Sequence, residues 1–212
     1  MPVRICAAEF DIIRAVRKNI VILAAGDFPK KGGAAWRILE TADKVVCCDS
    51  AAIAYRRRMG REPDAVVGDC DSIKGDFKNV VRIAEQETND LEKAVRYCNS
   101  KGWRHPLILG ATGRREDHTI GNIFRAAAFG LEIVTNYGRF IPFSGRMTFT
   151  TAKGAAISIF ATDPATRMTS TGLEWPLDEV RFKNLYCATL NRATSDRVVI
   201  ESDRPACAYF AE

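Results

Sequence analysis

The sequence predicts an α/β region followed by an all-β region: a Rossmann-like parallel sheet with helices on both faces, then an antiparallel β-sandwich or barrel. In the first part, continuously apolar runs alternate with stretches of helical spacing. Strands that are apolar throughout are typical of a parallel sheet whose two faces are both covered. In the second part, short stretches of alternating polar and apolar residues show no helical period, which is typical of antiparallel β structure.

The elements of the first part follow from these patterns in order. We expect six strands, which lie within 19–33, 44–52, 63–72, 79–86, 106–113 and 131–138. Four helices are expected between them, within 34–42, 51–60, 88–102 and 117–130. Thr88 or Asn89 can cap the third helix, and Gly102 and Gly130 can end the last two.

The pattern changes near residue 139, where turn residues begin to interrupt short alternating stretches that continue to the end of the chain. We therefore expect one α/β domain over residues 1–140 and one antiparallel β domain over residues 141–212.

Composition narrows the class of protein. The net charge of +5 is mild and spread along the chain, and no uncharged apolar run reaches the roughly 18 residues that span a bilayer. The N-terminus lacks a signal-peptide core, so we expect a cytoplasmic protein without a membrane partner. The basic stretch at 55–60 is typical of a solvated helix face, and we expect no nucleic-acid partner. Seven cysteines without a C-x-x-C pair, and only two histidines, argue against a zinc site or a disulfide framework.

Acidic side chains follow several of the predicted strands. Asp27 and Asp49 come after the first two strands, and the third is followed by Asp69 and Asp71. Two carboxylates this close repel each other unless a cation or proton lies between them, so this stretch is either an acidic surface turn or a metal site. Because the carboxyl ends of parallel strands meet at one edge, these acids should converge there, joined by Asp90 at a helix start. Carboxylates without histidine or thiolate suit a hard cation, above all Mg²⁺.

A glycine-rich loop follows the fifth strand, in the sequence "LGATGRREDH". Its backbone N–H groups stand at a helix N-terminus, where they suit a phosphate, and Arg114 and Arg115 can bind phosphate oxygens. The loop is not a Walker P-loop, and the first strand is not followed by a dinucleotide-binding fingerprint. These residues by themselves indicate a Mg²⁺-dependent enzyme that acts on a phosphorylated substrate.

Four segments together resemble the thiamine pyrophosphokinase family. They are Gly68-Asp69-x-Asp71-Ser72, "QETNDLEKAV" at 86–95, "GATGRREDHTIGN" at 110–122 and "TSTGLEWPL" at 169–177. The resemblance extends over about residues 20–212. It implies Mg²⁺-dependent transfer of pyrophosphate from ATP to the hydroxyl of thiamine, which gives thiamine diphosphate and AMP. It also implies a homodimer with its active sites at the subunit interface.

The resemblance implies a role for individual residues. The Mg²⁺ ligands would be Asp69, Asp71 and Asp90. The ATP contacts would be Asp49, Ser50, Ser72, Gln86, Lys93, Thr112 and Arg115. Thiamine would be held by Asp117, Ser170, Thr171 and Trp175, while Asn122 and Asn191 match family asparagines.

Some roles stay open at this stage. If a general base is needed, Asp71 or Asp117 would supply it, although Asp117 could instead cap its helix. Trp175 could be a core or interface aromatic. The chain departs from the family at Arg114, where a glycine is usual, and at Asn89, where many members have threonine. The alternative functions are a metal-dependent nucleotide-sugar transferase and a non-catalytic sensor of thiamine or a nucleotide.

Overall fold

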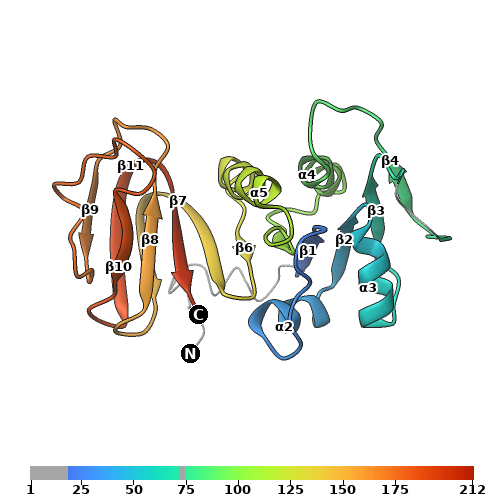
Figure 1. Ribbon diagram of the computed structural model, residues 1–212, viewed down its shortest axis with the longest axis horizontal. Helices are drawn as coiled ribbons and strands as arrows, with labels where there is room; N and C mark the ends of the chain where they lie inside the picture. The colour runs from blue at the N-terminus through green and yellow to red at the C-terminus, as the bar shows by residue number, and fades with distance from the viewer. Residues whose placement is uncertain (1–18, 72–74) are drawn as a thin grey trace. The chain divides into compact units, whose positions relative to one another are not determined.

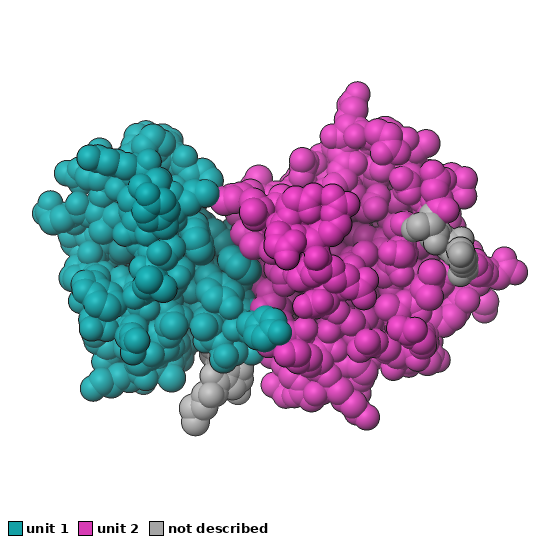
Figure 2. All heavy atoms as spheres, in the orientation of Figure 1, with its two compact units in different colours: residues 1–17, 137–212 teal, residues 18–136 magenta. Residues whose placement is uncertain are grey.

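The computed structural model describes residues 19–71 and 75–212. These residues form two compact units, one ending at Asn136 and the other beginning at Tyr137 (Figure 2). The division lies a few residues before the expected one at 140/141, because the first long strand of the second unit already begins at Gly138.

The first unit contains a parallel six-stranded sheet in the order β6-β5-β1-β2-β3-β4 (Figure 1). Its strands are β1 (Ile20–Leu23), β2 (Lys44–Cys48), β3 (Ala65–Gly68), β4 (Val80–Arg82), β5 (Leu107–Leu109) and β6 (Ile133–Val134). Its helices are α2 (Ala34–Glu40), α3 (Ala51–Met59), α4 (Asp90–Ser100) and α5 (Glu116–Ala128). The Rossmann-like sheet expected from the sequence is confirmed.

Alternation along the strands explains why helices cover both faces of this sheet. Val21 and Leu23 pack with the buried residues of α2 and α3. Ile22 and Cys48 point to the opposite face, where the Cys48 thiol lies 3.6 Å from the carbonyl oxygen of Asp90 at the start of α4. Figure 1 shows α4 and α5 on the face opposite α2 and α3. Burial on both faces accounts for the continuously apolar strands.

The strand order places a topological switch point between β1 and β5. From β1 the chain proceeds through β2, β3 and β4 in one direction, and then returns to place β5 and β6 on the other side. The loops that leave β1 and β5 therefore begin next to each other at the carboxyl edge of the sheet. Ligands of open parallel sheets bind at such an edge.

The second unit is antiparallel throughout. Its strands are β7 (Gly138–Thr150), β8 (Ala156–Phe160), β9 (Met168–Thr171), β10 (Ala188–Arg192) and β11 (Arg197–Ala211). β11 pairs with β7 along its length, with an irregularity between Ser202 and Ala206. On the N-terminal side of this irregularity β11 pairs with β9, and on its C-terminal side β11 pairs with β8. β8 in turn pairs with β10. β11 therefore pairs with three other strands of this unit, and Phe149 and Phe210 belong to its hydrophobic core.

No helix in the described part of the chain is both long enough and apolar enough to cross a membrane.

Candidate active site

The acidic residues predicted at the strand ends converge beside Gly68, the last residue of β3. A methyl group placed on Gly68 would lie 3.1 Å from Oδ1 of Asp90 and 3.2 Å from Cβ of Asp49. Burial raises the pKa of the Asp90 carboxyl, the Lys93 ammonium opposes this, and the charges of Asp49 and Asp69 raise it further. Three carboxylates from three separate segments therefore share one environment. A glycine at position 68 is what lets α4 approach β3 this closely.

Asp71 lies in a different setting from these three. It is exposed in the turn after β3, and its backbone N–H donates a hydrogen bond of 3.3 Å to Oδ1 of Asp69. The structure thus brings together Asp49, Asp69 and Asp90, whereas the sequence grouped Asp71 with the last two. Ser72, expected to contact ATP, lies outside the described residues.

The donor chemistry of this cluster fits a hard divalent cation. Carboxylate oxygens are the ligands that Mg²⁺ prefers, and a cation would offset both the burial and the repulsion that raise the pKa of Asp90. Across residues 19–71 and 75–212, no three acidic, cysteine or histidine side chains are arranged as a ready-made ligand set. Mg²⁺ commonly takes one or two carboxylates and completes its shell with water and substrate phosphate. The assignment of Asp69, Asp71 and Asp90 as ligands remains a prediction.

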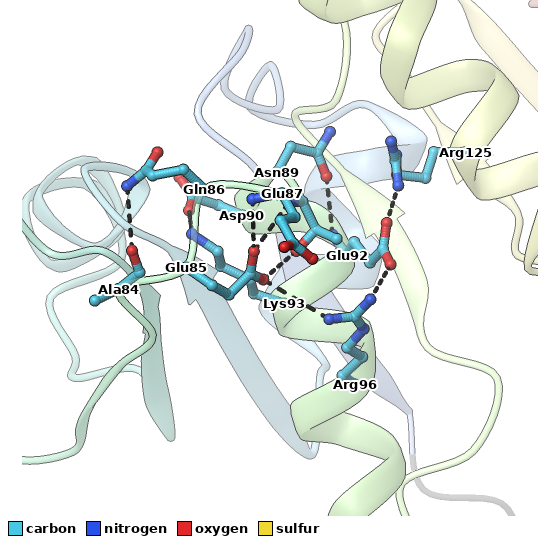
Figure 3. Close-up of polar contacts among 11 residues, drawn as sticks. Ala84, Glu85, Gln86, Glu87, Asn89, Asp90, Glu92, Lys93, Arg96 and Arg125 are labelled. Atoms are coloured by element: carbon cyan, nitrogen blue, oxygen red, sulfur yellow. Dashed lines mark hydrogen bonds and ion pairs between the residues drawn. The ribbon is translucent and has the colours of Figure 1, made fainter.

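Lys93 forms an ion pair with this acidic cluster through Asp90. Its side chain is only 2% exposed, and its Nζ lies 3.6 Å from Oδ1 of Asp90, one helical turn earlier on α4 (Figure 3). A buried ammonium needs a counter-charge, which Asp90 provides. Lys93 and Asp90 therefore form a charged pair at the N-terminal end of α4.

The N-terminus of α4 is fixed by Asn89. Its side-chain oxygen accepts a hydrogen bond from the N–H of Glu92 at 3.0 Å, which confirms Asn89 and not Thr88 as the cap. Its amide nitrogen also donates to Oδ1 of Asn122 at 3.1 Å, and Asn122 donates to the carbonyl oxygen of Ala111 at 3.0 Å. A threonine at position 89 could cap the helix but could not span this second contact. The amide therefore replaces the usual hydroxyl and also ties α4 to α5 and to the loop after β5.

The segment before α4 is held by Glu85. Its carboxylate accepts hydrogen bonds from the Thr88 hydroxyl and from the N–H groups of Glu87 and Thr88, at 2.8 and 3.0 Å for the latter two. The neighbouring Gln86 is exposed, and its amide donates only a long bond of 3.5 Å to the carbonyl of Ala84 (Figure 3).

The loops after β1 and β5 pack backbone against backbone. The N–H of Gly26 donates to the carbonyl of Gly110 at 2.7 Å, and the N–H of Asp27 donates to that of Thr112 at 2.8 Å. A side chain at position 26 would overlap both carbonyl oxygens, and one at Gly113 would overlap the carboxylate of Asp27. The close approach of these two loops explains why glycine occupies positions 26 and 113. It also brings Asp27 to the carboxyl edge of the sheet.

Arg114 adopts a left-handed backbone conformation, with a φ of 62°. Such a conformation favours glycine, which explains why a glycine is usual at this position. Nη1 of Arg114 donates to the carbonyl of Ala25 at 3.1 Å, so the side chain fastens the loop after β5 to the loop after β1. The departure from the family pattern adds a contact at the expense of backbone strain.

Arg115 and Asp117 form an exposed ion pair at the start of α5. Arg115 donates from Nε and Nη2 to the two carboxylate oxygens, at 3.1 and 2.5 Å. This contact lowers the pKa of Asp117 to about 2. α5 begins at Glu116 with Arg115 as its cap residue, so the alternative that Asp117 caps the helix is wrong. Asp117 is fully ionised at neutral pH.

The remaining expected nucleotide contacts lie on the same carboxyl edge. Asp49 has a φ of 39°, and Ser50 directly precedes α3. Thr112 is partly buried in the loop after β5.

The residues expected to hold thiamine lie on the second unit. Trp175 is 54% exposed, so it is not a core aromatic of this unit. Asn191, which is buried, holds the backbone of Trp175 from both sides: it accepts from the N–H at 3.2 Å and donates to the carbonyl at 2.7 Å. Ser170 accepts a hydrogen bond from the N–H of Leu177 at 2.9 Å, and Thr171 is exposed at the end of β9.

Two features of the site were not predicted from the sequence. The sequence indicates Asp27 only as an acid after a strand, because its contact with Gly113 depends on the strand order. The sequence indicates Glu92 only as part of a helical pattern, whereas in the structure its carboxylate is buried between Arg96 and Arg125 (Figure 3). The signal available was weak: an i,i+4 pair of Glu92 and Arg96.

Comparison with known proteins identifies the family. The model for the thiamin pyrophosphokinase catalytic domain matches residues 35–134, and that for the thiamin pyrophosphokinase substrate-binding domain matches residues 138–209. The chain belongs to the thiamin pyrophosphokinase family. Together the two matches cover both units that the structure contains.

This thiamin pyrophosphokinase family member is similar to one plant protein in sequence and to several solved structures in fold. Thiamine pyrophosphokinase 1 of rice (Oryza sativa subsp. japonica) is 37% identical over 31% of this chain and 31% of its own length, so the match spans about a third of that relative. Among solved structures, a thiamin pyrophosphokinase family protein from Enterococcus faecalis superposes with a TM-score of 0.75 at 15% identity, covering 92% of this chain and 99% of that one. Thiamine pyrophosphokinase from Bacillus subtilis gives a TM-score of 0.69 at 18% identity, covering 91% and 99%. At these identities the structures establish the shared fold.

Proposed function

We propose that this chain transfers the pyrophosphoryl group of ATP to the hydroxyl of thiamine, which gives thiamine diphosphate and AMP. The observation that supports this most strongly is the cluster of Asp49, Asp69 and Asp90 with Lys93 at the carboxyl edge of the sheet, in a chain that matches both family domains. In this reaction the thiamine oxygen bonds to the β-phosphorus of ATP, and the bond from that phosphorus to the α–β bridging oxygen breaks. The hydroxyl proton leaves, and AMP departs with the bridging oxygen.

The roles of the acidic cluster follow from its charge. Asp69 and Asp90, with Asp71 from the exposed turn, would hold Mg²⁺, which supplies charge neutralisation for the phosphate oxygens. Asp49 lies beside Asp90 and adds negative charge to this site. Lys93 neutralises Asp90 and presents its ammonium toward the same edge.

The loops at the switch point would hold the phosphates of ATP. Arg115 presents a planar guanidinium near the N-terminus of α5, and Thr112 contributes a hydroxyl from the preceding loop. Gln86 and Ser50, together with Ser72, complete the expected set of nucleotide contacts. Pyrophosphoryl transfer depends mainly on alignment and charge stabilisation, and these residues supply both.

The β unit would hold thiamine. The thiazolium of thiamine carries a fixed positive charge, and the exposed ring of Trp175 offers a face that attracts cations. Ser170 and Thr171 lie on β9 and supply hydroxyl groups. Asp117, ionised and salt-bridged to Arg115, would attract the same cation and orient its hydroxyl. If the transfer needs a proton acceptor, Asp71 or Asp117 would serve.

Assembly and location belong to the same proposal. A homodimer would combine the catalytic unit of one copy with the thiamine-binding unit of another, in a cytoplasmic protein. Light scattering on the purified chain measures the mass directly, and a monomer would contradict the dimer.

The reaction is tested by incubating the protein with ATP, Mg²⁺ and thiamine. We expect stoichiometric formation of AMP and thiamine diphosphate, with no AMP when thiamine is omitted. Production of ADP alone would contradict pyrophosphoryl transfer. Binding of both substrates without turnover would favour a sensor, and consumption of a sugar nucleotide would favour a glycosyl transferase.

A further inference from the structure

We propose that Glu92 is a positioning residue that holds the helix carrying Asp90 against the helix that follows the phosphate loop, and that turnover depends on this tie. The inference rests on the proposed function, since it concerns how the residues of the same site are held in position. Glu92 is placed to touch neither phosphate nor thiamine in this scheme. It acts through two arginines, one on each helix.

The first observation is the burial of the Glu92 carboxylate. Its side chain is 9% exposed, although it belongs to a charged residue on a helix of only moderate length. It lies between Asp90 and Lys93 in the sequence, so any movement of Glu92 moves both of these. A buried carboxylate is retained in a fold only when it is paired, and the loss of its pairing is costly.

The second observation is that its two partners come from different helices. Arg96, four residues along α4, donates from Nη2 to Oε1 of Glu92 at 2.5 Å. Arg125, on α5, contacts the other carboxylate oxygen, Oε2 (Figure 3). Oε1 of Glu92 therefore binds an arginine of α4, the helix that carries Asp90. Oε2 binds an arginine of α5, the helix that follows the phosphate loop.

The tie extends to the segment before α4. Nη1 of Arg96 also lies 3.7 Å from Oε1 of Glu85, the residue whose carboxylate organises the turn through Thr88. The Thr88 hydroxyl and the backbone N–H groups lower the pKa of Glu85. The turn that presents Gln86 is thus connected, through Arg96, to Glu92 (Figure 3).

A second link joins the same two helices a turn away. Asn89 donates to Asn122, and Asn122 donates to the carbonyl of Ala111 in the loop after β5. Two links between α4 and α5 fix both the separation and the rotation of the helices. Loss of the Glu92–Arg125 link would remove the charged one of these two links, and α4 could then move relative to the phosphate loop.

The consequence for the reaction is specific. Small displacements away from the reacting atoms can lower rates by as much as about 100-fold, because alignment supplies much of the catalysis. We expect Glu92→Gln to lower kcat by about 10- to 100-fold. The Mg²⁺ concentration for half-maximal rate should rise several-fold, because Asp90 is displaced, while the KM for thiamine should stay within twofold.

The experiment measures kcat, the thiamine KM and the Mg²⁺ half-saturation of the full-length protein and of Glu92→Gln, at a temperature where circular dichroism shows both folded. The matched control is Glu201→Gln, which removes a carboxylate from an exposed ion pair with Arg146 in the β unit. We expect the control to match the unmodified protein. If Glu92→Gln lowered kcat only in proportion to the folded fraction, with Mg²⁺ half-saturation unchanged, Glu92 would be merely structural and the proposal would be overturned.

A second variant covers the case in which Glu92→Gln fails to fold. Arg125→Gln removes the α5 partner, whose side chain is 40% exposed, and leaves the Glu92–Arg96 pair in place. It should reproduce the lower kcat and the higher Mg²⁺ requirement with unchanged thiamine KM. Where both single variants fold, the double variant should be little worse than either one, because the residues act as a unit. Fully additive effects, or wild-type kinetics for Arg125→Gln, would contradict the tie.

Failure of this proposal can be told apart from failure of the proposed function. If the unmodified protein forms no AMP from ATP and thiamine, the proposed reaction is wrong. If the unmodified protein is active and both variants keep its kcat and Mg²⁺ dependence, only the positioning role of Glu92 is wrong.

Discussion

The α/β unit and the β unit hold their expected ligand-binding residues in opposite ways. In the α/β unit, charged side chains lie close together where the backbone of one element approaches another, as Asp49 and Asp90 do beside Gly68. In the β unit, the exposed Trp175 projects from a backbone that a buried asparagine holds by two hydrogen bonds. The first arrangement suits phosphates and a metal, which require fixed charges. The second suits an aromatic cation, which requires an open ring face. Substitutions in the two units should therefore alter different kinetic constants.

The largest effect should come from Asp90→Asn. Loss of this charge would remove a proposed metal ligand and leave the ammonium of the buried Lys93 without its counter-charge, so we expect kcat to fall by about 100- to 1,000-fold. Steady-state AMP formation measures it. Asp76→Asn, a change of the same kind at an exposed acid outside the cluster, is the control.

Asp71→Asn compares the two predicted metal ligands. A smaller loss of kcat than in Asp90→Asn would mean that Asp71 contributes less to the metal site. Full activity of Asp90→Asn would contradict the metal assignment.

Close approach of the loops is tested by Gly26→Ala. The added methyl group would overlap the carbonyl oxygens of Gly110 and Thr112, so the loops after β1 and β5 must separate. We expect a destabilisation of about 1–3 kcal/mol, measured by urea unfolding, with a higher KM for ATP. Gly121→Ala is the matched control, since a methyl group there meets nothing within 4 Å. Equal stability of the two variants would show that the loops tolerate separation.

The β unit is tested by Trp175→Ala. Removal of the exposed ring should raise the thiamine KM by about tenfold and leave the KM for ATP unchanged, because cation–π contacts contribute on the order of 1 kcal/mol. Tyr186→Ala removes another strongly exposed aromatic of the same unit and serves as the control. An unchanged thiamine KM in Trp175→Ala would remove Trp175 from the site.

The smallest effect is expected from Arg114→Gly. Glycine relieves the left-handed backbone but loses the bond to the carbonyl of Ala25. We expect a net stabilisation of about 1 kcal/mol, seen as a rise in Tm of about 2–4 °C by calorimetry. A lower Tm would mean that the side-chain bond outweighs the strain. A loss of activity would indicate that Arg114 contacts phosphate.

The sequence by itself determined the elements and the edge at which the site lies. Continuous apolar runs such as that of β1 predicted buried parallel strands, and the cap at Asn89 predicted the start of α4, because both depend on local spacing. The positions of Asp69 and Asp90 followed from the rule that carboxyl ends meet at one edge. Only the tertiary structure decided which acids are neighbours. Asp49 lies against Asp90, and Glu92 reaches Arg125, because the strand order brings β2, β3 and two helices together. Such contacts join residues far apart in the sequence, and no local pattern encodes them.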